Sequence, residues 1–201
     1  YDALCPECGF VYAEKRPPES FLENYYTDAH DSYDGIEEIC IDYDTGVRLK
    51  TVKTFLPTGS SILEVGAGAG HFVQDLVRNG YDAEGLDPKD QSDKEDLEKG
   101  YIGSEEKPQT LQKKKYDAIV SYYVMEHLRS PNEWLKEVLK HLNPEGFFIV
   151  EVPDFSNHPL ESLNDEHLLH FRPEHMKMLL TKHGLDIIEY DIKASRYFGF
   201  T

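Results

Sequence analysis

The sequence predicts an α/β fold in which helices cover both faces of a mostly parallel sheet. Short apolar runs alternate with amphipathic stretches along most of the chain, and turns that contain glycine or proline separate them. This alternation is typical of parallel sheets, whose strands need crossover helices between them. The length of 201 residues suits one such domain with a small appendage.

The first strand and helix signals come after a helix expected at about residues 44–56. Residues 62–65 are short and apolar, as in a buried strand, and residues 70–79 carry a helical stripe. The members of the stripe are Phe72, Val73, Leu76 and Val77. Residues 81–86 form the next strand signal, which an Asp-Pro pair ends.

The second half of the chain repeats this pattern. Strands are expected at residues 116–122, 147–152 and 187–192. Helices are expected at residues 131–142, where apolar positions recur at i, i+3, i+4 and i+7, and at residues 173–183. A turn that contains glycine follows each of these two helices.

Residues 1–43 are expected to form an N-terminal extension of the domain at residues 44–201. The extension has a Cys-Pro-Glu-Cys segment near its start, a helix signal after Pro17 and an acidic, loop-like stretch at residues 27–44. Since the first residue is Tyr1 rather than methionine, we expect an earlier part of the chain to precede it.

The charge balance excludes some classes of partner. The formal net charge is −17, so its field repels phosphate, and we expect no nucleic-acid partner. No apolar run approaches the roughly 18 residues that a membrane span needs, and no secretory signal is visible. Three cysteines fit a reducing, cytosolic setting better than a disulfide scaffold.

A glycine loop follows the first strand, in the stretch "SILEVGAGAGHF" at residues 61–72. Ligands of open parallel sheets bind at the carboxyl ends of strands, and glycine lets them approach the backbone. Dinucleotide enzymes use G-x-G-x-x-G, but the position five after Gly66 is His71. The spacing G-x-G-x-G therefore favours S-adenosylmethionine, and a nicotinamide cofactor stays as an alternative.

Two acidic residues flank this loop in the sequence. Glu64 stands inside an apolar strand, where a charge is costly without a partner, and the ammonium and sulfonium of S-adenosylmethionine supply one. Asp87 ends the next strand, where a carboxylate accepts hydrogen bonds from both ribose hydroxyls. Both positions therefore fit the same cofactor.

Four segments resemble class I S-adenosylmethionine-dependent methyltransferases. "LEVGAGAGHF" resembles their first cofactor motif, and "GYDAEGLDP" resembles their ribose-binding strand. "YDAIVSYYVMEHLRSPNEWLKEVLKHLNPEGFFIVEVPD" resembles the fourth strand, its helix and the fifth strand. "DEHLLHFRPEHMKMLLTKHGLDIIEY" resembles the substrate loop of a subgroup that includes C-methyltransferases of nucleotide-linked deoxysugars, and "CPECGFVYAEKRPPESFLENYY" resembles that subgroup's N-terminal segment.

This resemblance implies a Rossmann-like, seven-stranded, mostly parallel sheet with a late antiparallel strand. It also implies that the backbone near Ile102 and Gly103 flanks the adenine, and that Tyr122 and Tyr123 lie beside the methionine end. Tyr25 and Tyr26 either close over the pocket or pack in the core. The cofactor-binding residues expected on these grounds are Glu64, Gly66, Ala67, Gly68, Asp87, Pro88, Ile102, Gly103, Tyr122 and Tyr26.

Methyl transfer to a hydroxyl or carbon also needs a base, most often histidine. The resemblance implies His167 as the base, Glu166 as its partner and His127 as a positioning or electrostatic group. A purely structural role stays open for each histidine. Further candidates are contacts of His30 and His170 with substrate, and a metal site at Asp165, Glu166, His167 and His170.

Zinc is not expected in this chain, although the resembling subgroup carries an N-terminal zinc module. A structural zinc site needs four ligands, and only Cys5 and Cys8 form a pair. Cys40 and His30 lie at unconvincing spacings, so a first zinc knuckle is expected before Tyr1.

The expected function is methyl transfer from S-adenosylmethionine to oxygen or carbon of a small polar, sugar-like or nucleotide-linked metabolite. One alternative is O-methylation of a quinone-type or other small hydroxylated molecule. A second is a cofactor-binding module without catalysis. A monomer or homodimer is expected.

Overall fold

The computed structural model describes residues 2–18, 36–88, 95–102, 108–112, 115–157, 159, 166–189, 192–193 and 199–200. The chain divides into two compact units. The sheet unit consists of Pro18–Ser121 and Glu137–Ile149, and the hairpin unit consists of Tyr1–Pro17, Tyr122–Lys136 and Val150–Thr201.

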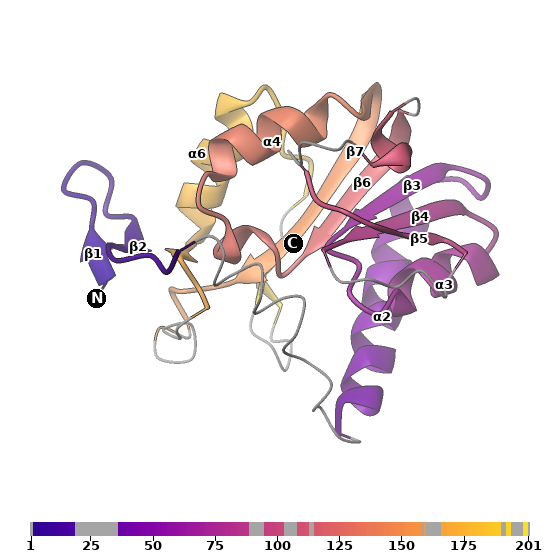
Figure 1. Cartoon of the computed structure of the whole chain (residues 1–201), viewed down its shortest axis with the longest axis horizontal. Helices are drawn as coiled ribbons and strands as arrows, with labels where there is room; N and C mark the ends of the chain where they lie inside the picture. The colour runs from indigo at the N-terminus through magenta and orange to yellow at the C-terminus, as the bar shows by residue number, and fades with distance from the viewer. Residues whose placement is uncertain are drawn as a thin grey trace. The chain divides into compact units, whose positions relative to one another are not determined.

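The sheet unit is built on parallel strands, so the predicted α/β class with a mostly parallel sheet is confirmed (Figure 1). The strands lie in the order β5 (Leu97–Lys99), β4 (Asp82–Asp87), β3 (Ser61–Val65), β6 (Tyr116–Tyr122) and β7 (Leu142–Pro153). Strand β3 pairs in parallel with both β4 and β6, and β4 pairs in parallel with β5. The carboxyl ends of β3 and β4 therefore lie side by side.

The centre of the sheet is apolar because its strands are covered by other elements. Ile62 and Leu63 of β3 are fully buried, as are Ala118, Ile119 and Val120 of β6. The short strand β5 lies in a polar stretch, and the sequence did not predict it.

Helix α3 (His71–Arg78) packs against α2 (Ile36–Phe55) and β4. Phe72, Val73 and Leu76 are buried as predicted, but Val77 is 40% exposed and lies outside the buried stripe. Helix α2 begins in the stretch expected to be a loop. The apolar residues of that stretch do recur with helical spacing, but its many acidic residues mask the pattern.

The hairpin unit contains a second, antiparallel sheet. Its strands lie in the order β1 (Asp2–Leu4), β2 (Val11–Ala13) and β8 (Leu169–His170), so the start of the chain pairs with a segment far along it. The end of β7 continues into this unit, where it pairs antiparallel with β10 (Gly199–Phe200), which pairs with β9 (Ile192–Lys193). The predicted domain boundary after residue 43 lies within α2.

Two predicted elements end in the wrong place. The strand expected at residues 187–192 is found only at β9 (Ile192–Lys193), and residues 187–189 have no regular structure. Ile187 and Ile188, which suggested that strand, are 38% and 70% exposed, so burial does not hold them against a sheet. Helix α4 (Pro131–Leu139) ends early, and Leu142 already belongs to β7.

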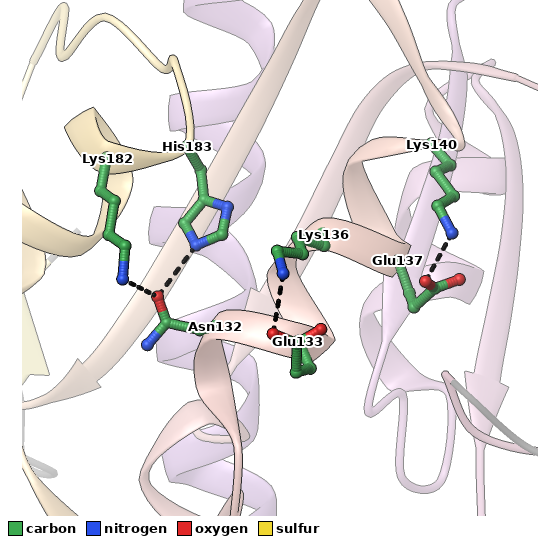
Figure 2. A network of polar contacts seen from close by, with 7 residues as sticks. All are labelled: Asn132, Glu133, Lys136, Glu137, Lys140, Lys182 and His183. Atoms are coloured by element: carbon green, nitrogen blue, oxygen red, sulfur yellow. Dashed lines mark hydrogen bonds and ion pairs between the residues drawn. The ribbon is translucent and has the colours of Figure 1, made fainter.

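The charged surface of α4 carries local polar contacts (Figure 2). Asn132 Oδ1 accepts hydrogen bonds from Lys182 at the end of α6 (Pro173–Lys182) and from the ring of His183, at 3.0 and 3.2 Å. Ion pairs at i, i+3 join Glu133 to Lys136 and Glu137 to Lys140. Exposed pairs of this kind contribute less than about 1 kcal/mol each.

None of the helices among the described residues is both long and apolar enough to cross a membrane.

Candidate functional site

A glycine loop leaves the carboxyl end of β3 and leads into α3. The N–H of Gly66 donates to the carbonyl oxygen of Leu86 at 2.8 Å, and the N–H of Gly68 donates to Oδ2 of Asp87 at 2.8 Å. The loop is therefore fastened to the end of β4 by a main-chain bond and by a charge-assisted bond.

Two glycines explain the spacing of the motif. Gly68 has φ +51°, and a Cβ built on it would meet no other atom within 4 Å, so its side is open. Gly70 has φ +73°, and a Cβ there would lie 2.5 Å from Cδ1 of Leu97. Gly70 therefore allows close packing against a residue of strand β5. In the dinucleotide pattern, a glycine one position later in the sequence has the corresponding packing role.

Glu64 lies on β3 with 4% of its surface exposed. Its Oε2 has no hydrogen-bond partner among the described residues. The pKa of Glu64 is raised to about 8, mainly by burial; Arg48 and the N–H of Val73 oppose the shift, and the Asp87 carboxylate adds to it. A buried carboxylate oxygen without a hydrogen bond is costly, so Oε2 of Glu64 suits a cation or a hydrogen-bond donor.

The other residues expected around the cofactor are distributed between the two units. Ala67 and Ile102 are buried in the sheet unit, and Pro88 is partly exposed there. Tyr122 is buried at the end of β6, in the hairpin unit. Gly103, Tyr25 and Tyr26 lie outside the described residues, as do His30 and Asp165.

A second cluster of ionisable groups lies within the hairpin unit. It consists of Glu126, His127 and His167, whose ligand-type atoms all lie within 4.8 Å of one another. The two imidazole rings meet edge to face with centroids 5.0 Å apart. Glu126 and His127 come from the short helix η2 (Met125–His127), directly after β6, and His167 comes from the segment before β8. We call this group the EHH cluster.

Two hydrogen bonds hold the segments of the EHH cluster together. The N–H of Leu168 donates to the carbonyl oxygen of Glu126 at 2.8 Å, and Nδ1 of His127 lies 3.0 Å from the carbonyl oxygen of Glu166. A carbonyl accepts only, so Nδ1 of His127 carries the proton and Nε2 keeps its lone pair. Burial lowers the pKa of His127, while the Glu166 carbonyl opposes that change.

Glu126 is the member of this cluster that sequence reasoning left without a role. It is 1% exposed, and neither Oε1 nor Oε2 has a hydrogen-bond partner among the described residues. Its pKa is raised to about 8, mainly by burial; its own backbone N–H opposes the shift and the Glu151 carboxylate adds to it.

Tyr123 is a second residue that the sequence underrated. It has φ +57°, and no other non-glycine residue in the described part of the chain has positive φ. Its N–H donates to the carbonyl oxygen of Glu151 at 2.9 Å and its hydroxyl donates to Oε1 of Glu151 at 3.0 Å. Such strain is concentrated at functional sites. The sequence did contain one sign of this contact: Glu151 is an acid within the apolar run of β7, as Glu64 is within β3.

His170 does not belong to the EHH cluster and contacts β1 instead. It is 2% exposed, and its Nε2 lies 3.1 Å from Oδ1 of Asp2 on β1. Cys5 and Cys8 lie in the turn between β1 and β2, where the N–H groups of Cys8 and Glu7 lower the pKa of the Cys5 thiol. Among the described residues, no third ligand joins the two cysteines.

Several solved methyltransferase structures share this fold. One is the 1,6-didemethyltoxoflavin N1-methyltransferase of Burkholderia thailandensis, with TM-score 0.66 and 11% identity over 99% of this chain and 95% of that one. Another is the magnesium protoporphyrin IX methyltransferase of Synechocystis PCC 6803, with TM-score 0.61 and 10% identity over 91% and 96%. An S-adenosylmethionine-dependent methyltransferase of Archaeoglobus fulgidus gives TM-score 0.60 and 15% identity over 87% and 78%.

The parallel sheet and the glycine loop at the end of β3 define a Rossmann-like methyltransferase fold. A family model described as a methyltransferase domain matches residues 43–190, which is more than half of the chain. The chain belongs to this family and is an S-adenosylmethionine-dependent methyltransferase. No curated protein matches it.

Proposed function

We propose that this enzyme transfers the methyl group of S-adenosylmethionine to oxygen or carbon of a small polar metabolite, sugar-like or nucleotide-linked. The observation that carries the proposal is the pairing of two carboxylates with one glycine loop. Glu64 and Asp87 come from adjacent parallel strands, and the loop is hydrogen-bonded to Asp87.

Each part of the cofactor has a partner in this proposal. Asp87 accepts the ribose hydroxyls, and Glu64 neutralises the positive methionine portion. The open side of Gly68, with Gly66 and Ala67, admits the cofactor to the backbone, while Pro88, Ile102 and Gly103 flank the nucleoside. Tyr122 follows the fourth strand beside the methionine end, and Tyr26 closes over it.

The chemical step needs alignment and removal of one proton. The S–CH3 bond breaks as the new bond to the acceptor forms, and the acceptor's proton passes to His167. Glu166 orients that histidine, and His127 positions the acceptor. Support comes from the EHH cluster, which gathers His127 and His167 in one unit.

A polar acceptor fits these groups better than a quinone does. The imidazoles of His127 and His167 and the buried carboxylates of Glu126 and Glu151 can form hydrogen bonds with a polar molecule. A sugar-like acceptor satisfies these groups, whereas an apolar ring leaves them without partners. The proposal includes a monomer or homodimer and a cytosolic location, and the low cysteine count supports that location. The proposal also includes the full seven-stranded sheet, which the strand order β5-β4-β3-β6-β7-β10-β9 supports.

The test is turnover with two panels of acceptors, followed by mass spectrometry of the products. We expect methylation of nucleoside-diphosphate sugars and no product from catechols or reduced quinones. Turnover with the aromatic panel alone would replace this proposal by the quinone-type alternative. Saturable cofactor binding without turnover in either panel would favour a non-catalytic module.

A further inference from the structure

The EHH cluster has a feature that a base and its partner do not explain. Glu126 is buried with both carboxylate oxygens unpartnered among the described residues. Its Oε1 lies 3.8 Å from Nε2 of His127, which is too long for a hydrogen bond. A buried carboxylate in this state lacks the compensation that such groups normally have.

The neighbouring His127 is oriented as a ligand rather than as a hydrogen-bond donor to Glu126. The Glu166 carbonyl oxygen, 3.0 Å from Nδ1 of His127, fixes the tautomer in which Nε2 presents a lone pair. A hydrogen bond from the second ring nitrogen to a carbonyl is the usual support of a histidine that binds a metal ion. His167 adds a second imidazole against the same ring.

From these contacts we infer that Glu126, His127 and His167 bind one divalent cation of the zinc type. Two imidazoles and one carboxylate form a three-ligand set that leaves coordination positions open for another oxygen. Imidazole favours zinc and its transition-metal neighbours over magnesium or calcium.

The spacing of the three groups is compatible with a single ion after small adjustments. Ligands held at about 2.0–2.2 Å from zinc lie roughly 3.3–3.6 Å from one another in a tetrahedral site. The present separations all lie within 4.8 Å, so side-chain shifts of at most about 1 Å close the site. The bonds from Leu168 to Glu126 and from His127 to Glu166 hold the two backbone segments in register.

This inference deepens the proposed function and rests on it only for the role of the open positions. They take an oxygen of the polar acceptor, and the ion lowers the pKa of that group. In the metal-free state His167 takes the acceptor's proton. In the metal-bound state His167 is a ligand, and the acidified acceptor would lose its proton to water.

The experiment titrates the full chain with Zn²⁺ by calorimetry and with Co²⁺ by visible absorption. It uses a Cys5→Ser/Cys8→Ser background, because thiolates are themselves zinc ligands and would add a competing signal. We expect one ion per chain, a Co²⁺ spectrum of nitrogen and oxygen ligands, and affinity reduced at least about tenfold by Glu126→Gln and by His167→Ala. His183→Gln, which changes a partly exposed histidine directly after α6, is the matched control and keeps full affinity.

Absence of Zn²⁺ binding in the background chain would overturn the inference. So would Zn²⁺ affinity in the Glu126→Gln and His167→Ala variants that equals the affinity of the background chain. Binding of S-adenosylhomocysteine to the same samples reports folding and the cofactor site separately. A chain that binds the nucleoside but no metal refutes only the metal site, and a chain that binds metal but no nucleoside refutes only the proposed cofactor site.

Discussion

The backbone N–H of Gly68 donates a 2.8 Å hydrogen bond to Oδ2 of Asp87. This bond joins the glycine loop after β3 to the last residue of β4, so the loop and the proposed ribose acceptor form one rigid element. A change at either residue is therefore expected to affect both.

Replacement of Asp87 tests that coupling. Asp87→Asn keeps an oxygen for the Gly68 N–H but removes the charge, and we expect S-adenosylhomocysteine to bind about tenfold more weakly, which corresponds to about 1.4 kcal/mol. Asp87→Ala removes the acceptor as well, so a larger loss is expected. Calorimetric titration measures both, and unchanged affinity in the alanine variant would exclude Asp87 from the cofactor site.

Glu64 gives a prediction about pH and stability. Its native pKa of about 8 lies above the ordinary value of 4.5, so between these pH values the native state binds more protons than the unfolded state. The contribution of Glu64 to stability is therefore present below pH 4.5 and is lost as the pH rises towards 8. We expect Glu64→Gln to raise the free energy of unfolding by roughly 2 kcal/mol at pH 8 and to have little effect at pH 4.5.

Urea unfolding of the metal-free and cofactor-free chain at the two pH values measures this difference. The same variant is expected to bind S-adenosylmethionine more weakly, because the amide no longer neutralises a cation. A Glu64→Gln chain that is less stable at pH 8 than the parent would contradict the account of this carboxylate.

Gly85 on β4 tests the packing beneath the loop. A Cβ there would crowd Leu97, and it would lie 2.8 Å from Cβ of Ala67 and 2.9 Å from Cγ2 of Val73. Because Cβ of Ala67 cannot move without the loop backbone, Gly85→Ala should cost about 1–3 kcal/mol of stability and weaken cofactor binding.

Gly59→Ala is the control for this variant. Gly59 has φ +89°, and a Cβ at this position would meet no atom within 4 Å, so alanine there introduces backbone strain of about 1–2 kcal/mol without touching the loop. Denaturant unfolding and cofactor titration of both variants make the comparison. Equal effects of the two substitutions on cofactor affinity would show that Gly85 does not support the loop.

The histidines His167 and His170 separate a reactive role from a structural one. His167→Asn is expected to lower kcat by about 10²- to 10⁴-fold with little change in cofactor affinity. His170→Asn should leave kcat within a few fold and lower stability, because Nε2 of His170 contacts Asp2 on β1. Steady-state kinetics and thermal unfolding of each variant check this, and the reverse pattern would move the reactive role to His170.

The sequence allowed prediction of those parts of the fold that local periodicity determines. Strands β3, β4 and β6 and helix α3 lie where their apolar patterns indicate, because burial of one run or stripe decides each of them. The pairing of β2 with β8 was beyond such reasoning, since it joins segments more than 150 residues apart. The first turns of α2 were not predicted because acidic residues dominate that stretch. The exposed Ile187 and Ile188 led to the wrong prediction of a strand.

The candidate site divides in the same way. Glu64 and Asp87 were predictable because each is an acid at a fixed place beside the glycine loop. The burial of Glu126 was not predictable, although the Glu126-His127 pair was a candidate, because that burial follows from tertiary packing alone. The positive φ of Tyr123 likewise could not be predicted from the residues around it.

Calorimetric titration of the unmodified chain with S-adenosylmethionine and, separately, with NADH tests the central claim most directly. We predict saturable binding of one S-adenosylmethionine per chain, release of protons near pH 7 as Glu64 ionises, and no heat with NADH. Binding of NADH in place of S-adenosylmethionine, or heat from neither ligand, would contradict the assignment of the loop and its two carboxylates.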